Sequence, residues 1–258
     1  MKTNHLFGSL LTVIALSGNA LMAQTTTPAT ATSTVAPNPA LRAKSSTMYT
    51  EHTELFAEYR PPVVGRPNRF TAHLTRLGQT FSPYTEATVT LTLTIDGKVD
   101  YTETLTKPVA PGNFRFALKP ATAGRGTVTI DLVTPAYTDQ FVVKDVTVYA
   151  DEPTAIASQP APEPTTGEIG YNKEKSWFEP FATAPVMSRK RGKTAVLSVP
   201  QSALVSENDG VYVFVQKTPE RFLKQAIKTG TKQGDIVEVV SGLQASDRIV
   251  ILGTGNIN

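Results

Sequence analysis

Residues 196–253, VLSVPQSALVSENDGVYVFVQKTPERFLKQAIKTGTKQGDIVEVVSGLQASDRIVILG, decide the fold of the C-terminal part of the chain. Short runs of alternating apolar and polar residues are separated by turn-forming segments at 207–210, 217–220 and 233–235. Alternation with period two indicates strands with one buried face, and Gly, Asn, Asp and Pro between them indicate tight turns. The stretch therefore predicts a small antiparallel β-domain, and it contains no catalytic motif.

The region from Tyr49 to Ala150 contains further alternating runs, namely TELFAEY, RFTAHLTRL, ATVTLTLTI, VDYTETLT, NFRFAL, GTVTIDLV and FVVKDVTVYA. This density of short strands is typical of an immunoglobulin-like β-sandwich. The clearest hairpin turns at Asp96-Gly97, because Gly tolerates the positive φ that tight hairpins require. We expect the threonines between Val89 and Ile95 to face solvent. The predicted fold class is all-β, with an N-terminal sandwich and a small C-terminal domain.

Composition divides the chain into five segments. Residues 1–23 carry Lys2, an apolar run and a small-residue exit, which is the pattern of a secretory signal peptide. The Thr/Ala/Pro-rich segment 24–47 predicts a disordered tether, and the prolines of 151–176 predict a linker that avoids helix and sheet alike. The sandwich then occupies 48–150, and the C-terminal domain occupies 177–258.

The composition also excludes several classes of protein. The formal net charge of +3 is too small to indicate a nucleic-acid partner. The chain has no Cys, which excludes disulfides, thiolate sites and a lipid anchor on cysteine. No stretch of the mature chain approaches the roughly 20 apolar residues of a membrane helix. We therefore expect a protein of the periplasm.

Catalytic motifs are missing from the sequence. The mature chain has two histidines, His52 and His73, and no nucleophile elbow, zinc-protease motif or phosphate loop. We therefore predict that the protein is not an enzyme. We keep one enzymatic alternative, a hydrolase in which carboxylates from strands distant in the sequence form the active site. It ranks third, after the two binding functions described below.

Met48, His52 and His73 form the one constellation that suggests a metal. Thioether and imidazole are ligands that Cu(I) or Ag(I) prefers when no cysteine is present. The three residues meet only if the first two strands of the sandwich pair or face each other. The competing interpretation is that His73 is a half-buried sheet histidine and that Met48 belongs to the tether.

The densest charge run is Ser188-Arg189-Lys190-Arg191-Gly192-Lys193. The functional interpretation is contact with anionic lipid headgroups of the inner membrane or with an acidic protein surface. The other interpretation, which we favour, is a solvated turn.

The sequence of the C-terminal stretch resembles that of the membrane-proximal end of periplasmic adaptor subunits of RND efflux pumps, also called membrane fusion proteins. The resemblance rests on VPQSAL, GVYVFV, ERF, IKTG, VEV, GL and DRIV in this order. The segments at 53–56, 70–75 and 169–174 are similar to the N-terminal extension of heavy-metal, CusB-like adaptors. The resemblance implies that six residues of the shared motifs serve to shape the fold: Pro200, Gly210, Gly230, Gly242, Leu243 and Asp247. The three glycines are expected at strand ends where a side chain would hinder the turn.

A complete adaptor carries a lipoyl-like domain, a helical hairpin and most of a β-barrel between these ends. Only 18 residues separate Trp177 from Val196, which is too few to contain that central region. The resemblance implies an RND inner-membrane pump, a full-length adaptor, or both as partners, and a heavy metal as cargo. An accessory subunit and a shortened gene product are both compatible with it. The alternative function is a free periplasmic β-sandwich protein that binds a metal or small ligand.

Overall fold

The computed structural model describes residues 40–162, 164–191 and 194–257. The expected signal peptide and most of the expected tether lie outside the described residues. Residues 39–258 form one compact unit. Its elements are almost all β-strands, which confirms the all-β fold class. No helix in the described part of the chain is long and apolar enough to cross a membrane.

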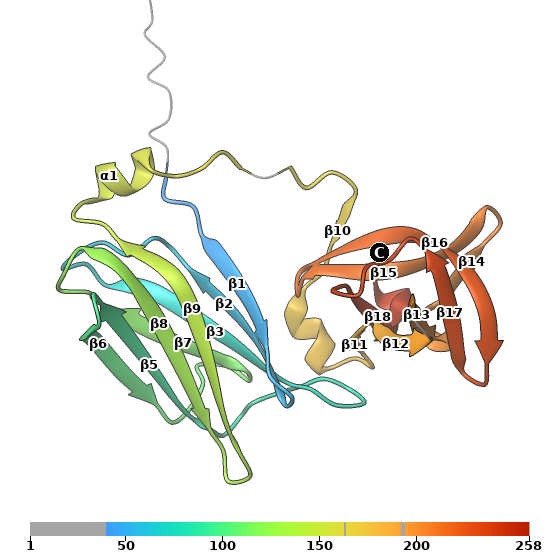
Figure 1. Cartoon of the computed structure of the whole chain (residues 1–258). Helices are drawn as coiled ribbons and strands as arrows, with labels where there is room; N and C mark the ends of the chain where they lie inside the picture. Colours follow the sequence, from blue (N-terminus) through green and yellow to red (C-terminus); the bar gives the residue numbers. More distant parts are fainter. Residues whose placement is uncertain (1–39, 163, 192–193, 258) are drawn as a thin grey trace, which may run out of the picture. The chain divides into compact units, whose positions relative to one another are not determined.

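Two antiparallel sheets form the N-terminal sandwich (Figure 1). In the first sheet β1, β2 and β3 are consecutive neighbours, and β4 and β7 both pair with β3. The second sheet has the order β6-β5-β8-β9. The chain crosses between sheets from β3 to β5, from β6 to β7 and from β7 to β8, as in immunoglobulin-like sandwiches. The bounds are β1 Lys44–Tyr49, β2 Thr53–Tyr59, β3 Asn68–Arg76, β4 Ser82–Pro83, β5 Thr88–Ile95, β6 Lys98–Leu105, β7 Asn113–Leu118, β8 Gly124–Val133 and β9 Thr138–Val148.

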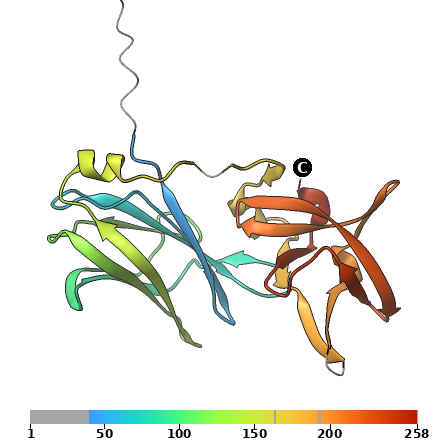
Figure 2. The ribbon, with the colours of Figure 1, turned by 45° about the horizontal axis from the view of Figure 1, so that its top comes forward.

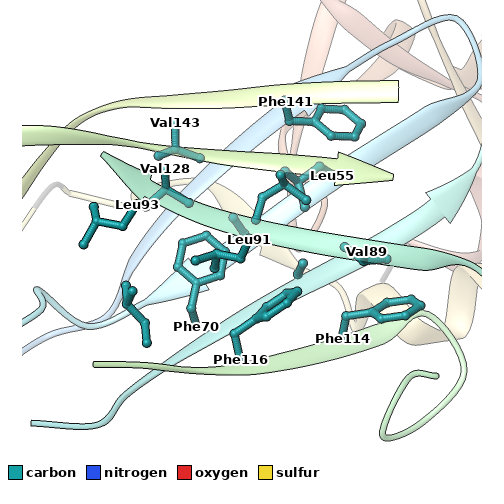
Figure 3. Close-up of a cluster of buried hydrophobic side chains, with 14 of the residues drawn as sticks. Leu55, Phe70, Val89, Leu91, Leu93, Phe114, Phe116, Val128, Phe141 and Val143 are labelled. Carbon is teal, nitrogen blue, oxygen red and sulfur yellow. The ribbon is translucent and has the colours of Figure 1, made fainter. Parts of the chain in front are cut away.

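The core of the sandwich is built by the predicted alternation. Leu91 of β5 and Phe116 of β7 come from opposite sheets and are buried in one cluster, shown in Figure 3. The threonines that alternate with the buried residues of β5 lie on the outer face, where the hydroxyl groups of Thr90 and Thr104 are 2.9 Å apart. At the hairpin tip Asp96 and Gly97 have φ of 48° and 77°. The turn therefore has the positive φ values that the Asp-Gly pair predicted.

The observed elements differ from the expected segments in three places. Strand β1 begins at Lys44, inside the expected tether, because its polar sequence is held by pairing with β2. Helix α1, Glu152–Ala157, lies in the expected linker. Pro153 is compatible with it because a first-turn amide needs no helical partner, and Asp151 caps it by accepting from Thr154 N at 2.8 Å.

The third difference is at the end of the expected linker, where β10, Glu168–Gly170, pairs with β16 and the short helix η1 begins at Lys173. The C-terminal sheet has the order β11-β18-β15-β16-β17-β13-β12, with β14 also beside β15. Its orange and red strands curve strongly in Figure 2. One apolar cluster lies within this domain, and a second combines its residues with Phe81 from the loop after β3. The bounds are η1 Lys173–Trp177, β11 Ala182–Pro185, β12 Met187–Arg191, β13 Thr194–Pro200, η2 Gln201–Ala203, β14 Val205–Glu207, β15 Gly210–Thr218, β16 Arg221–Gln233, β17 Ile236–Ser241, β18 Arg248–Leu252 and η3 Thr254–Asn256.

Candidate functional site

The three predicted metal ligands lie in β1, in the turn after it and in β3. Met48 packs against the sandwich core in the same cross-strand row as Leu74. His73 is the neighbour of Leu74 in the strand, so its side chain lies on the opposite face of the sheet. His52 packs on Tyr137, with ring centroids 4.2 Å apart. The structure therefore does not bring the three residues together.

His73 instead lies between carboxylates. Its Nε2 is 3.1 Å from Oε2 of Glu58, and its Nδ1 is 3.1 Å from Oε1 of Glu174, although only the first contact is aligned as a hydrogen bond. The hydrogen bond with His73 holds the pKa of the Glu58 carboxyl below its usual value, against partial burial. Burial, followed by the charges of Glu58 and Glu174, raises the pKa of Glu220. Across residues 40–162, 164–191 and 194–257, no group of three or more His, Asp or Glu side chains is arranged to hold a metal.

A buried ion pair lies on the same face of the sheet. Lys173 Nζ of η1 is 2.6 Å from Glu54 Oε1 of β2, and each side chain is only 1% exposed. Lys173 also donates to Thr75 Oγ1 at 2.5 Å, and Trp177 Nε1 donates to the same oxygen at 3.0 Å. The sequence signal for this pair is weak, since it consists of a lysine in a short apolar segment beside the chain's single Trp.

Glu54 is held as a carboxylate by several donors. Tyr49 OH donates to its Oε2 at 3.0 Å, and Gln216 Nε2 donates at 3.3 Å. Burial by itself would raise the pKa of Glu54, but the charge and hydrogen bond of Lys173 and these two donors hold it below the usual value. A buried charge is tolerated in this way only when it is paired and hydrogen-bonded.

The network continues into the C-terminal strands. Gln216 lies on β15 and accepts from the Thr183 hydroxyl of β11 at 2.9 Å. Arg248 of β18 donates from Nε to Thr183 Oγ1 at 2.8 Å, and its guanidinium lies 4.1 Å from the centroid of the Tyr49 ring. Sandwich, η1 and C-terminal sheet are thus joined by one polar network.

The residues marked by the adaptor resemblance have different local roles. Gly242 has a φ of +102°, and a Cβ there would lie 2.5 Å from Ala226 O, so glycine is required. Gly210 is the first residue of β15, as expected, but a Cβ there would have room. Gly230 lies within β16 instead of at a strand end. Leu243 packs against the second C-terminal cluster.

The two remaining marked residues shape turns. Pro200 directly precedes the short helix η2. Asp247 accepts from Gln244 N at 2.7 Å, which closes the turn before β18. In the C-terminal domain these residues contribute to turns, strands and packing.

Comparison with known proteins agrees with the resemblance of the C-terminal domain to efflux adaptors. Residues 197–254 match the family model described as the CzcB C-terminal circularly permuted SH3-like domain. The match covers less than a quarter of the chain. A search of curated proteins found no match.

One solved structure, that of ZneB from Cupriavidus metallidurans, is similar to the chain at 17% identity and a TM-score of 0.22. The aligned region covers 71% of this chain and 40% of the ZneB chain. The chain therefore spans less than half the length of that relative.

Proposed function

We propose that the protein is a non-enzymatic, adaptor-like component of an RND-type efflux system of the periplasm, and that it acts by contact with the pump. The observation that supports this most directly is the match of residues 197–254 to the C-terminal SH3-like domain of CzcB. The ordered series of motifs shared with RND adaptors covers the same residues. We further propose a heavy metal as the cargo, from the resemblance of the N-terminal segments to CusB-like adaptors.

The hydrogen-bonded junction between the two domains supports a function by contact. Glu54 of the sandwich pairs with Lys173 of η1 and accepts a hydrogen bond from Gln216 of β15, which connects the sandwich to the C-terminal strands. A subunit that binds a pump through one domain can then hold the other at a defined position. A role in bridging the pump to an outer-membrane channel is not part of the proposal, because only 18 residues lie between Trp177 and Val196.

Site-specific photocrosslinking in the native cell tests the proposal. A benzoylphenylalanine is placed at Val240, which is 65% exposed on β17, and separately at Val99, which is 66% exposed on β6. The positions are matched in residue type and exposure but lie in different domains. We expect a crosslink from position 240 to an RND inner-membrane pump or its full-length adaptor, and none from position 99.

The readout is the identity of the crosslinked partner by mass spectrometry. Equal crosslinking from both positions would contradict docking through the C-terminal domain. Crosslinks that contain neither a pump nor an adaptor would count against the proposed function as a whole.

A further inference from the structure

The hydrogen bond between His73 and Glu58 determines which ring nitrogen of the histidine carries a proton. Nε2 of His73 lies 3.1 Å from Oε2 of Glu58, and this contact is aligned as a hydrogen bond. Because a carboxylate only accepts, the proton of this bond lies on Nε2. A neutral imidazole with its proton on Nε2 has a lone pair on Nδ1. The second ring nitrogen is therefore able to bind a cation.

This second nitrogen is buried and has no hydrogen-bond partner. His73 is 7% exposed, and its Nδ1 makes no hydrogen bond with any described residue. Oε1 of Glu174 lies 3.1 Å from Nδ1 but out of line for a hydrogen bond. A lone pair beside a carboxylate oxygen is unfavourable when both are shielded from water, unless a cation binds both. Two atoms bound to one metal ion at about 2.0–2.2 Å each are about 3 Å apart or slightly more, which matches this pair.

Asn113 of β7 contributes another buried atom without a partner. Asn113 is the cross-strand partner of His73, and Leu74 N donates to Gly112 O at 2.8 Å, so the two residues form a non-hydrogen-bonded pair. Side chains of such a pair lie on one face of the sheet, with Cβ atoms about 4.5–5.5 Å apart. Oδ1 of Asn113 is buried and makes no hydrogen bond within the described part of the chain. Two unpaired acceptors thus lie side by side on neighbouring strands.

The charges around His73 favour a cation. Glu58 and Glu174 face its two ring nitrogens, and their charges also raise the pKa of Glu220, so a third carboxylate lies near them. Lys173 of η1 is already paired with Glu54. The sheet contributes two cations to this face, and both are exposed: Arg69 and Arg115. A positive ion at Nδ1 would therefore lie in contact with one carboxylate and close to two more.

The types of donor atom indicate which ion would bind. Imidazole nitrogen together with carboxylate oxygen suits divalent ions such as Zn²⁺. The thioether of Met48, which Cu(I) or Ag(I) would prefer, lies on the other face of the sheet. A histidine that binds a metal usually donates from its other nitrogen to a carboxylate, as Nε2 of His73 does to Glu58.

We propose that Nδ1 of His73, the Glu174 carboxylate and the Asn113 side-chain carbonyl bind one divalent cation of the Zn²⁺ type. Water completes the coordination, and Glu58 is a positioning residue that fixes the tautomer of His73. The third protein ligand is an amide oxygen, so the site needs no third His, Asp or Glu side chain. It goes beyond the proposed function, since it requires neither a pump nor an adaptor.

The proposed ion would connect η1 to two strands of the sandwich. Glu174 belongs to η1, whereas His73 and Asn113 belong to β3 and β7. η1 already lies against the beginning of β7, because a Cβ on Gly112 would come within 2.5 Å of the Trp177 ring. Metal binding should therefore stabilise the existing arrangement.

Isothermal titration of the untagged mature chain with ZnCl₂ at pH 7 tests the proposal. We expect one Zn²⁺ per chain, with no measurable binding in His73→Gln. Glu58→Gln should bind about 10–100-fold more weakly, because it removes the carboxylate behind the metal-bound histidine. His52→Gln changes the other histidine of the mature chain and should bind like the wild type. Glu174→Gln should weaken binding, whereas Glu179→Gln, an exposed glutamate a few residues further on, should not.

Two further measurements separate metal binding from a structural role of His73. Long-range ¹H–¹⁵N NMR spectra of the metal-free chain should show the proton on Nε2, and Zn²⁺ should shift mainly the Nδ1 signal. Zn²⁺ should also raise the urea unfolding midpoint of the wild type but not that of His73→Gln. The midpoint of His73→Gln without metal shows whether this variant is folded.

Several results would overturn the proposal. These are the absence of heat at millimolar Zn²⁺, equal affinities of the wild type and His73→Gln, and a Zn²⁺-dependent shift confined to Nε2. Protons on both ring nitrogens at pH 7 would show that His73 bridges Glu58 and Glu174 as an imidazolium, without a metal. Tighter binding of Ag⁺ than of Zn²⁺ would contradict the nitrogen and oxygen donor set.

Discussion

Replacing Lys173 by Met tests the central claim about the junction. The change removes the ammonium that lies 2.6 Å from Glu54 but keeps an apolar side chain of similar length. Glu54 would then be a buried carboxylate with three neutral donors, Thr75, Tyr49 and Gln216. Breaking a buried ion pair on one side costs about 3–5 kcal/mol, and the three neutral donors place the expected loss near the lower limit, about 3 kcal/mol.

The assay is urea unfolding followed by the fluorescence of Trp177, the single Trp of the chain, which bonds to Thr75 in the same network. Lys224→Met is the matched control. It breaks an ion pair of the same 2.6 Å length, to Glu207, but at the surface, so we expect a much smaller loss than in Lys173→Met. The double variant Lys173→Met with Glu54→Gln should recover most of the stability, because no buried charge is left.

The effect should also depend on pH. In the wild type the lowered pKa of Glu54 contributes stability that is present above the unfolded-state pKa and is lost as pH falls through the folded-state pKa. Without Lys173, burial dominates and the folded-state pKa rises, so the variant gains stability as the carboxyl is protonated. The difference between wild type and Lys173→Met should therefore shrink from pH 7 toward pH 4. A loss below 1 kcal/mol, or one that does not change with pH, would refute the argument.

Two further predictions concern the same face of the sheet. Gly112→Ala should lower the unfolding free energy by more than about 1 kcal/mol, because its Cβ would come within 2.5 Å of the Trp177 ring. Gly97 has a similar positive φ but open space around it, so Gly97→Ala should show the cost of backbone strain alone. Equal losses in the two variants, measured by urea unfolding, would argue against the contact. Because the bond with His73 lowers the pKa of Glu58, its contribution is lost as pH falls through the folded-state value, so Glu58→Gln should flatten the acid limb of the stability profile below about pH 4.5. A profile parallel to that of the wild type would contradict it.

Much of the fold could be predicted from local patterns. The alternation in β5, the Asp96-Gly97 turn and the helix after Pro200 all depend on residues close together in the chain, and each is present in the structure. Strand β1 and strand β10 were missed because their short sequences have little pattern of their own. Both are held by a neighbouring strand that lies further along the chain.

The candidate sites were harder to predict, for a related reason. Met48 and His73 are plausible ligands by type, but the register of β1, β2 and β3 places them on opposite faces of one sheet. Register depends on pairing between strands, which composition does not report. The buried partner of Lys173 was equally out of reach, since Glu54 lies 119 residues away.

The sequence by itself determined the all-β class, the two β-regions and the motifs that relate residues 197–254 to an SH3-like domain. These depend on periodicity, turn chemistry and residue order. Tertiary structure alone decided that Glu54 and Lys173 meet, that His73 lies between Glu58 and Glu174, and that the predicted metal ligands stay apart. The physical reason is that burial, pairing and charge compensation are properties of residues distant in the chain. Burial, pairing and charge compensation are therefore defined only once the sheets have packed.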